Sequence, residues 1–415
     1  MSRYRRLWAL PGAATLVVGG FLGRIGSGVT VVAWVILIRQ TRGSYAEAAA
    51  VASALGLATA AASPVVGRLA DRRSLSRVLL WCTVAYVVTQ LLLLAAVQLR
   101  ASLPLLVLVA AVSGSTLPPL SAGLRTTWSR LTGPDTEQAD LRSTAMAAES
   151  ALLELAYVLG PLLLSAVVLV TARLVPGSPH LGPAAAIGLA SLCTLVGTVW
   201  VGWGRAVQGV RPQPPTGPVH WSGPLRSGGF PLLLATAAGV MFAFGAAPVA
   251  ITAYCEQSHP GSGSSVTGVL IAVWSLGSAL AGLVFGALAV RAPLRTQYLV
   301  LLGGLAVGYL LWLAAPTTGL LAVVLFVTGA VIAPVLAVMA GLVAGLTPVT
   351  MRTEAYTWLT TTSNGVSALG AGVAGLVVDS SAGAEGGFVL AAVSTAAGLV
   401  LATRLPPVSE RSQPV

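Results

Sequence analysis

The chain of 415 residues is 56% hydrophobic and only 8% charged, and its mean hydropathy is +0.87. A soluble protein carries about 25% charged residues, so this composition excludes a soluble globular protein and indicates an integral membrane protein. The net charge of +11 comes from 23 arginines, because the sequence contains no lysine. These arginines stand in short segments between apolar runs, which membrane topology explains better than nucleic-acid binding does.

Twelve apolar runs are long enough to cross a bilayer, which takes about 20 residues of helix. The first run follows a basic N-terminus, but it is too long for a signal peptide and lacks a cleavage site. The predicted spans are 10–38, 45–70, 77–99, 103–124, 142–171, 183–204, 229–255, 264–290, 296–315, 319–346, 352–379 and 386–404.

A Pro-, Gly- and Arg-rich segment follows the sixth run and has no hydrophobic periodicity. Such a composition is typical of a linker. We therefore predict a six-helix bundle over 1–204, a cytoplasmic linker over 205–228 and a second six-helix bundle over 229–415.

Arginine placement predicts the orientation. With the N-terminus inside, the cytoplasmic segments hold 18 arginines and the outer segments hold 4, while Arg24 falls within a helix. Cytoplasmic loops carry the excess of positive charge in membrane proteins. We therefore expect both termini in the cytoplasm. The Ala-, Gly- and Arg-rich composition favours the inner membrane of a high-GC bacterium, and we expect a monomer.

The two halves of the sequence contain similar segments. Arg142 aligns with Arg352 and Gly160 aligns with Gly370 when the sequence is shifted by 210 residues. Repeated halves with a site between them are typical of secondary transporters.

A short motif lies between the second and third predicted spans. The segment GRLADRRSLSRVLL contains Gly67, Asp71, Arg72 and Arg77, and it resembles the cytoplasmic loop signature of the major facilitator superfamily. It departs from that signature at Ser74, where the family usually has glycine. The resemblance implies an all-α membrane protein of twelve transmembrane helices in two pseudo-symmetric six-helix bundles.

The same resemblance implies a gate at the cytoplasmic side. Gly67 would allow close helix contact, and Asp71 would accept hydrogen bonds from the start of the eleventh helix, near Arg352 and Glu354. This contact would latch the cytoplasmic side when the cavity opens outward. The alternative is that the basic cluster, with Arg72 and Arg77, only fixes the topology by its charge.

Gly160 and Pro161 resemble the Gly-Pro pair that drug/proton antiporters of the superfamily carry in the fifth helix. The flanking glycines of that pattern are absent. The pair is also an ordinary site for a helix kink. We include both residues among the predicted gating residues.

Two glutamates interrupt the fifth predicted span. Counted from the start of each span, Glu149 lies roughly 10 Å deep, Glu154 roughly 18 Å and Arg24 of the first span roughly 21 Å. Arg24 and Glu154 therefore share a depth, and a buried glutamate–arginine pair is expected. The two glutamates stand about 140° apart around the helix, so the second would face the cavity or a gate.

A carboxylate in the centre of a bilayer costs at least about 2.5 kcal/mol unless a partner or a proton neutralises it. We therefore predict that Arg24, Glu149 and Glu154 couple proton movement to transport. The alternative is a structural ion pair that only holds the first and fifth helices together.

Aromatic side chains and one amide are the predicted substrate-binding residues, because they lie in helices that this fold usually turns toward its cavity. Aromatic walls suit hydrophobic or cationic ligands, although many aromatic residues in membranes only pack or anchor. The candidates are Trp34, Tyr157, Phe242, Phe244, Tyr254, Trp274, Tyr356, Trp358 and Asn364.

Together these features predict proton-coupled efflux of a small hydrophobic or cationic compound, such as an antibiotic or metabolite, by alternating access. Proton-coupled uptake of a sugar or amino acid is the alternative. The expected partners are the substrate, protons and the lipid bilayer, without nucleic acid. No Ser-His-Asp set, metal cluster or phosphate loop is evident in the sequence, so we predict no enzyme activity, metal or cofactor.

Overall fold

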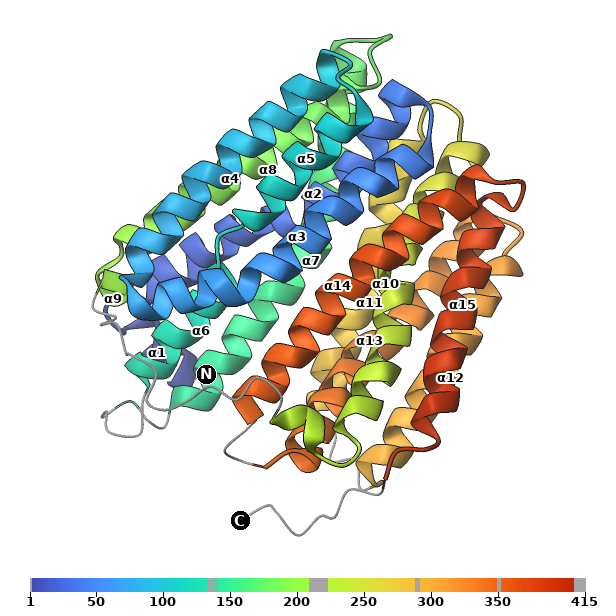
Figure 1. Cartoon of the computed structure of the whole chain (residues 1–415). Coiled ribbons are helices and arrows are strands. Elements are labelled where there is room, and N and C mark those ends of the chain that lie inside the picture. The colour runs from blue at the N-terminus through green and yellow to red at the C-terminus, as the bar shows by residue number, and fades with distance from the viewer. Residues whose placement is uncertain are drawn as a thin grey trace.

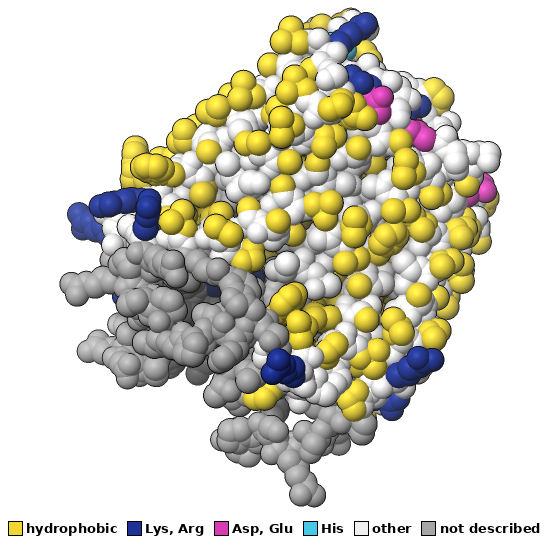
Figure 2. Space-filling view, viewed as in Figure 1, with side chains coloured by type: hydrophobic (Ala, Val, Ile, Leu, Met, Phe, Trp, Pro, Cys, Tyr) yellow, Lys and Arg dark blue, Asp and Glu magenta, His cyan; other side chains and the backbone are white. Residues whose placement is uncertain are grey.

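The computed structural model describes residues 2–132, 138, 141–208, 223–287, 292–348 and 352–406, and within these residues the regular structure is helical. Twelve helical segments of this part of the chain are long and apolar enough to span a membrane, which confirms the predicted number. Figure 2 shows hydrophobic side chains across the middle of the visible face and arginines near its ends.

The N-terminal half supplies six spans. They are preceded by a short helix, α1 (Ser2–Trp8), and by one π-helical stretch, η1 (Thr15–Gly19), that runs directly into α2. A short helix, α9 (Arg205–Gln208), follows them. The spans are α2 (Gly20–Arg42), α3 (Tyr45–Arg72), α4 (Leu75–Gln98), α5 (Leu103–Ser115) with α6 (Leu120–Leu131), α7 (Arg142–Leu174) and α8 (Leu181–Trp203).

The C-terminal half supplies the other six, after a single 3₁₀ turn, η3 (Pro224–Arg226). These helices are α10 (Phe230–Ser258), α11 (Gly263–Ala287), α12 (Leu294–Leu313), α13 (Thr318–Leu346), α14 (Arg352–Asp379) and α15 (Gly383–Ala402).

Two spans differ from the sequence-based expectation. The fourth is broken between α5 and α6, where Pro118 and Pro119 cannot donate backbone hydrogen bonds to a continuing helix. The first begins near Thr15 rather than at residue 10, because the chain turns at Gly12 after α1. Gly12 has a φ of +86°, which glycine adopts without strain.

The helices form two groups (Figure 1). Helices α2–α8 pack mainly on one another, as do α10–α15, and the groups meet where α3 packs on α14 and α7 packs on α11. We call these the N-terminal group and the C-terminal group. The end of the molecule that carries α1 and α9 is called the α1 end, and the opposite end, at the turn between α2 and α3, the Ser44 end.

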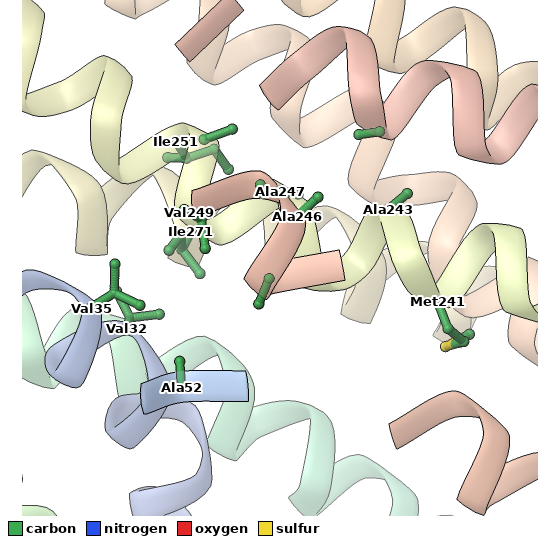
Figure 3. Close-up of a cluster of buried hydrophobic side chains, with 14 of the residues drawn as sticks. Val32, Val35, Ala52, Met241, Ala243, Ala246, Ala247, Val249, Ile251 and Ile271 are labelled. Carbon is green, nitrogen blue, oxygen red and sulfur yellow. The ribbon is translucent and has the colours of Figure 1, made fainter. Parts of the chain in front are cut away.

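The apolar cores connect the groups at one end only. One cluster of buried residues includes most of the C-terminal group and the part of the N-terminal group near the Ser44 end. Figure 3 shows part of this cluster, in which Val32 and Val35 of α2 face Val249 of α10 and Ile271 of α11. A second cluster, at the α1 end, contains only N-terminal residues such as Leu79. The described residues thus share a core across the two groups only toward the Ser44 end.

Candidate functional site

A buried ion pair joins α2 to α7. Arg24 donates a hydrogen bond from Nη2 to Oε1 of Glu149 and, at 3.1 Å, from Nε to Oγ of Ser121 on α6. The two charged side chains are only 4% and 2% exposed. Arg24 Nη1 and Glu149 Oε2 are also buried, and neither has a hydrogen-bond partner among the described residues. Removal of either partner would leave an uncompensated charge inside the N-terminal group.

Depth in the membrane had favoured Glu154 as the partner of Arg24, and the structure pairs Arg24 with Glu149 instead. Because the first span starts at Thr15, Arg24 lies about 14 Å along it, midway between the depths of the two glutamates, so depth does not select the partner. The face of α7 does: position 149 is about 20° around the helix from Gly160, which packs on Gly28 of α2, whereas position 154 is about 120° from it.

The approach of α2 to α7 is set by glycine. A Cβ placed on Gly160 would come within 2.8 Å of the Gly28 Cα. A side chain at either position would therefore separate the helices that carry Arg24 and Glu149. Pro161 lies next to Gly160 on the same helix and is buried.

Glu154 has a side chain outside the described residues, but its backbone lies within α7. Helical periodicity puts position 154 within about 20° of Pro161 and Ser165. That face of α7 meets α11, where Ser165 Oγ donates a 2.7 Å hydrogen bond to the carbonyl oxygen of Ser265. Position 154 is thus on the stripe that faces the C-terminal group, whereas Glu149 is on the face toward α2.

Helices α3 and α14 separate toward the α1 end. A Cβ on Gly375 would come within 2.1 Å of α3 and one on Gly372 within 2.6 Å, but one on Gly365 no closer than 4.0 Å. Farther along α3, a Cβ on Gly67 would meet no atom of the described residues within 4 Å. The close helix contact expected at Gly67 is not formed in this conformation, because the two helices have diverged before they reach it. It was expected for the state in which the cavity opens outward, and for that state it stays a prediction.

At the Ser44 end, Asp379 of α14 closes over the start of α3. Its carboxylate accepts hydrogen bonds from Ser44 Oγ at 2.6 Å, from the Tyr45 amide at 2.9 Å and from the Ala46 amide at 2.6 Å. A carboxylate at a helix N-terminus satisfies free amides and interacts favourably with the helix dipole. Asp379 thus ties the C-terminal group to the N-terminal group.

A second polar contact lies beside the first. Tyr45 donates a 2.9 Å hydrogen bond to Oε2 of Glu256 on α10, and Arg39 Nε lies 3.8 Å from the same oxygen. The Arg39 guanidinium also stands 4.8 Å from the centroid of the Tyr45 ring. Charged and polar groups therefore close the Ser44 end between the two groups of helices.

Polar side chains of α14 are exposed near the α1 end. Thr357, Thr360 and Asn364 lie about 100–180° around the helix from the exposed apolar stripe of Leu369 and Leu376. An exposed apolar stripe on a membrane helix is expected to face lipid, so the three polar residues face away from lipid. They thus line the space between the helix groups.

The faces of α14 and α7 that point toward the space between the helix groups become buried toward the Ser44 end. On α14, Ala371 and Val378 continue the polar face but are only 6% and 5% exposed. On α7, Tyr157 is 44% exposed, whereas Leu164, two turns later on the same face, is fully buried. Among the described residues, the space between the groups is therefore open toward the α1 end and closed at the Ser44 end.

Several predicted substrate-binding aromatics are packed inside helix groups instead. Trp34 is 1% exposed and donates a 2.8 Å hydrogen bond to Oε1 of Gln90 on α4, within the N-terminal group. In the C-terminal group, ring contacts at 5.3–6.2 Å between centroids connect Phe244, Trp274, Trp312, Phe388 and Tyr254 in that order. Edge-to-face and tilted ring packing accounts for these residues.

The other candidates are more accessible. Tyr356 is 37% exposed, and its hydroxyl donates a 2.9 Å hydrogen bond to the Ala340 carbonyl oxygen of α13. Phe242 and Trp358 are half-buried. Sequence reasoning missed Thr357 and Thr360, although hydroxyl residues four positions before and seven positions before Asn364 mark one helix face.

The predicted cytoplasmic latch falls largely outside the described residues, because it involves the side chains of Asp71, Arg72, Arg352 and Glu354. Arg77 is described and exposed. The latch therefore stays a prediction.

Comparison with known proteins identifies the family. A family model for the Major Facilitator Superfamily matches residues 16–263 and 233–415. The chain belongs to the Major Facilitator Superfamily. It is accordingly a multi-pass membrane protein and a transporter. No curated protein sequence matches it.

Solved structures share the fold. A mutant of the nucleoside transporter NupG superposes with a TM-score of 0.70 at 17% identity, over 94% of this chain and 98% of that one. A peptide transporter POT in complex with sulfate gives a TM-score of 0.68 at 15% identity, over 98% and 97%. A mutant peptide transporter POT in complex with alafosfalin gives 0.67 at 14% identity, over 95% and 93%.

The opening at the α1 end can be measured by thiol labelling. In purified protein, the cysteine of a Gly67→Cys variant should react with a maleimide at least about tenfold faster than that of an Ala371→Cys variant, because reactivity follows exposure. The native cysteines are replaced by serine in both variants. Faster labelling at position 371 would place the opening at the Ser44 end instead.

Proposed function

We propose that this transporter works by alternating access between two units, 1–204 and 229–415, joined by the linker 205–228. The tight contacts at the Ser44 end and the exposed inner faces at the α1 end support this mechanism. If the α1 end is cytoplasmic, as the arginines predict, this conformation is open to the inside. The opposite state would close the α1 end and release the contacts of Asp379 and Glu256.

Protons are the proposed coupling ions. In the C-terminal group the charged residues of the sequence stand at or near helix ends, and in the N-terminal half Glu149 and Glu154 are the acidic residues that stand within a helix away from its ends. Arg24 stands within α2. In this proposal the pair of Arg24 and Glu149 joins α2 to α7. Glu154, on the stripe toward the C-terminal group, then exchanges a proton against a cationic substrate.

The proposed direction is efflux, by antiport across a bacterial inner membrane, of a small hydrophobic or cationic compound such as an antibiotic. The observation that supports this direction is that the stripe of α7 toward the C-terminal group contains position 154, an acidic residue, on the same helix as Gly160-Pro161, which packs on Gly28. A carboxylate that faces an otherwise apolar, aromatic-containing space attracts an organic cation.

Proton-coupled uptake of a small nutrient is the second candidate. The exposed polar face of Thr357, Thr360 and Asn364 favours it, because hydroxyl and amide groups suit a hydrogen-bonding substrate. The solved structures with the same fold include a nucleoside transporter and a peptide transporter.

A transport assay in membrane vesicles distinguishes efflux from uptake. Inside-out vesicles that contain the protein should accumulate ethidium when energised and release it when an uncoupler collapses the proton gradient. Glu154→Gln should reduce this accumulation to the level of vesicles without the protein, because the variant cannot exchange a proton. Glu385→Gln, at an exposed position near the start of α15, serves as the matched control.

Gradient-driven accumulation of labelled uridine or dialanine in right-side-out vesicles, without ethidium transport, would favour uptake. Unchanged ethidium transport by Glu154→Gln across a range of pH would refute the coupling role of that residue.

A further inference from the structure

An exposed stripe runs along α4 and begins with an arginine. Trp81, Val84 and Val88 are 74%, 54% and 49% exposed, and they recur every three or four residues on one face of the helix. Arg77, four residues before Trp81, is exposed on the same face. Because exposed apolar side chains on a membrane helix face lipid, Arg77 stands where this face leaves the lipid tails.

Helix α8 carries a matching stripe that ends at the same level. Leu192, Val196, Trp200 and Trp203 are 53%, 46%, 45% and 68% exposed and share one face. Arg205, the first residue of α9, follows after Gly204 and is exposed. Toward the α1 end, both stripes thus change from aliphatic residues to tryptophan and then to arginine.

The two stripes lie side by side. Ser76 Oγ, next to Arg77, donates a 2.5 Å hydrogen bond to the carbonyl oxygen of Gly202, next to Trp203. Figure 2 shows the arginines that gather near this end of the molecule beside hydrophobic side chains, where Figure 1 places α9. We define the Arg–Trp patch as Arg77, Trp81, Trp200, Trp203 and Arg205.

No described acidic side chain neutralises the positive charge of the patch. Neither Arg77 nor Arg205 forms an ion pair with any acidic side chain in the described part of the chain. The N-terminus of α4 adds free backbone amides near Arg77, because Ser74 makes no side-chain capping hydrogen bond. The patch thus combines two guanidinium groups and free backbone amides, which can bind a phosphate group, with flanking indoles, which suit the acyl chains attached to that phosphate.

We propose that the Arg–Trp patch binds the headgroup of an anionic phospholipid in the leaflet at the α1 end. The arginines contact the phosphate with charge-assisted hydrogen bonds, and the tryptophans lie at the level of the headgroup and the first acyl carbons. The opposite face of the N-terminal group, toward the C-terminal group, is not involved. The site is therefore independent of the direction and the coupling of transport.

The proposal is tested with the full-length protein in phosphatidylcholine vesicles that contain phosphatidylglycerol brominated on its acyl chains. Bromine quenches nearby tryptophan fluorescence, so the part of the quenching that depends on Trp81 and Trp203 reports lipid bound at the patch. The double variant Arg77→Gln/Arg205→Gln should bind phosphatidylglycerol about thirtyfold more weakly, or about fivefold for each arginine. The variant Trp81→Phe/Trp203→Phe should lose most of the quenching by this lipid.

The matched control is Arg226→Gln/Arg404→Gln, which removes two exposed arginines at the same end of the C-terminal group. Unchanged quenching in this control, with loss in the patch variant, supports the proposal. An equal loss in both double variants would overturn it in favour of general surface charge. Displacement of the lipid by millimolar inorganic phosphate would also overturn it, since the site would then bind the free anion.

Discussion

Replacement of Arg24 by leucine should destabilise the protein by about 3–5 kcal/mol, because Glu149 would be left buried without a counter-charge. Both side chains are almost fully buried and belong to helices in close contact. The only other side-chain partner of Arg24 that the structure describes is Ser121, a neutral hydroxyl. Glu149 would have to take up a proton or draw water into the N-terminal group. Unfolding of the purified protein, followed by circular dichroism, measures the loss.

The double variant Arg24→Leu/Glu149→Leu should recover most of the lost stability, since both charges leave together and apolar side chains of similar size replace them. Arg173→Leu, at an exposed position in the last turn of α7, is the control for general loss of an arginine. A double variant that is as unstable as Arg24→Leu would contradict the ion pair as the cause.

The second large effect is expected at the Ser44 end. Asp379→Ala removes all three hydrogen bonds that join α14 to the start of α3. Hydrogen bonds to a charged group contribute about 1.5–3 kcal/mol each, and water can replace part of that in the open state. A net loss of about 1.5–3 kcal/mol would shift the conformational equilibrium about 10- to 100-fold toward opening of the Ser44 end.

Spin labels at Ser102, before α5, and at Ala382, between α14 and α15, report this opening as a longer distance in pulsed electron paramagnetic resonance. Glu385→Gln on α15 keeps the three hydrogen bonds and should leave the distance distribution unchanged. An unchanged distribution in Asp379→Ala would mean that Glu256 and the helix contacts close this end without the carboxylate.

Hydropathy predicted the twelve spans because lipid imposes a length and an apolar composition on every helix that crosses it. It did not predict which face of each helix is buried. In a soluble helix polarity marks the exposed face, but lipid-facing and buried side chains in a membrane helix are equally apolar. Trp81 and Trp274 have similar sequence surroundings, yet one is 74% and the other 7% exposed.

Because hydropathy does not show which face of a helix is buried, the candidate site could be predicted only in part. The sequence predicted a glutamate–arginine pair, since isolated charges within a membrane helix require neutralisation. The choice between Glu149 and Glu154 depended on which face of α7 packs on α2, and hydropathy does not indicate that face. Thr357 and Thr360 became candidates only when the contacts of α14 fixed the direction of each of its faces.

The stepwise widening between α3 and α14 has a consequence for side-chain size. Gly375 has no room for a Cβ in this conformation, whereas Gly67 has empty space around it. Under the proposed alternating access we expect the requirement to reverse in the opposite state, so that Gly67 becomes the crowded position and Gly375 the free one. Each of the two glycines, at opposite ends of the helix pair, would then be required by a different half of the transport cycle.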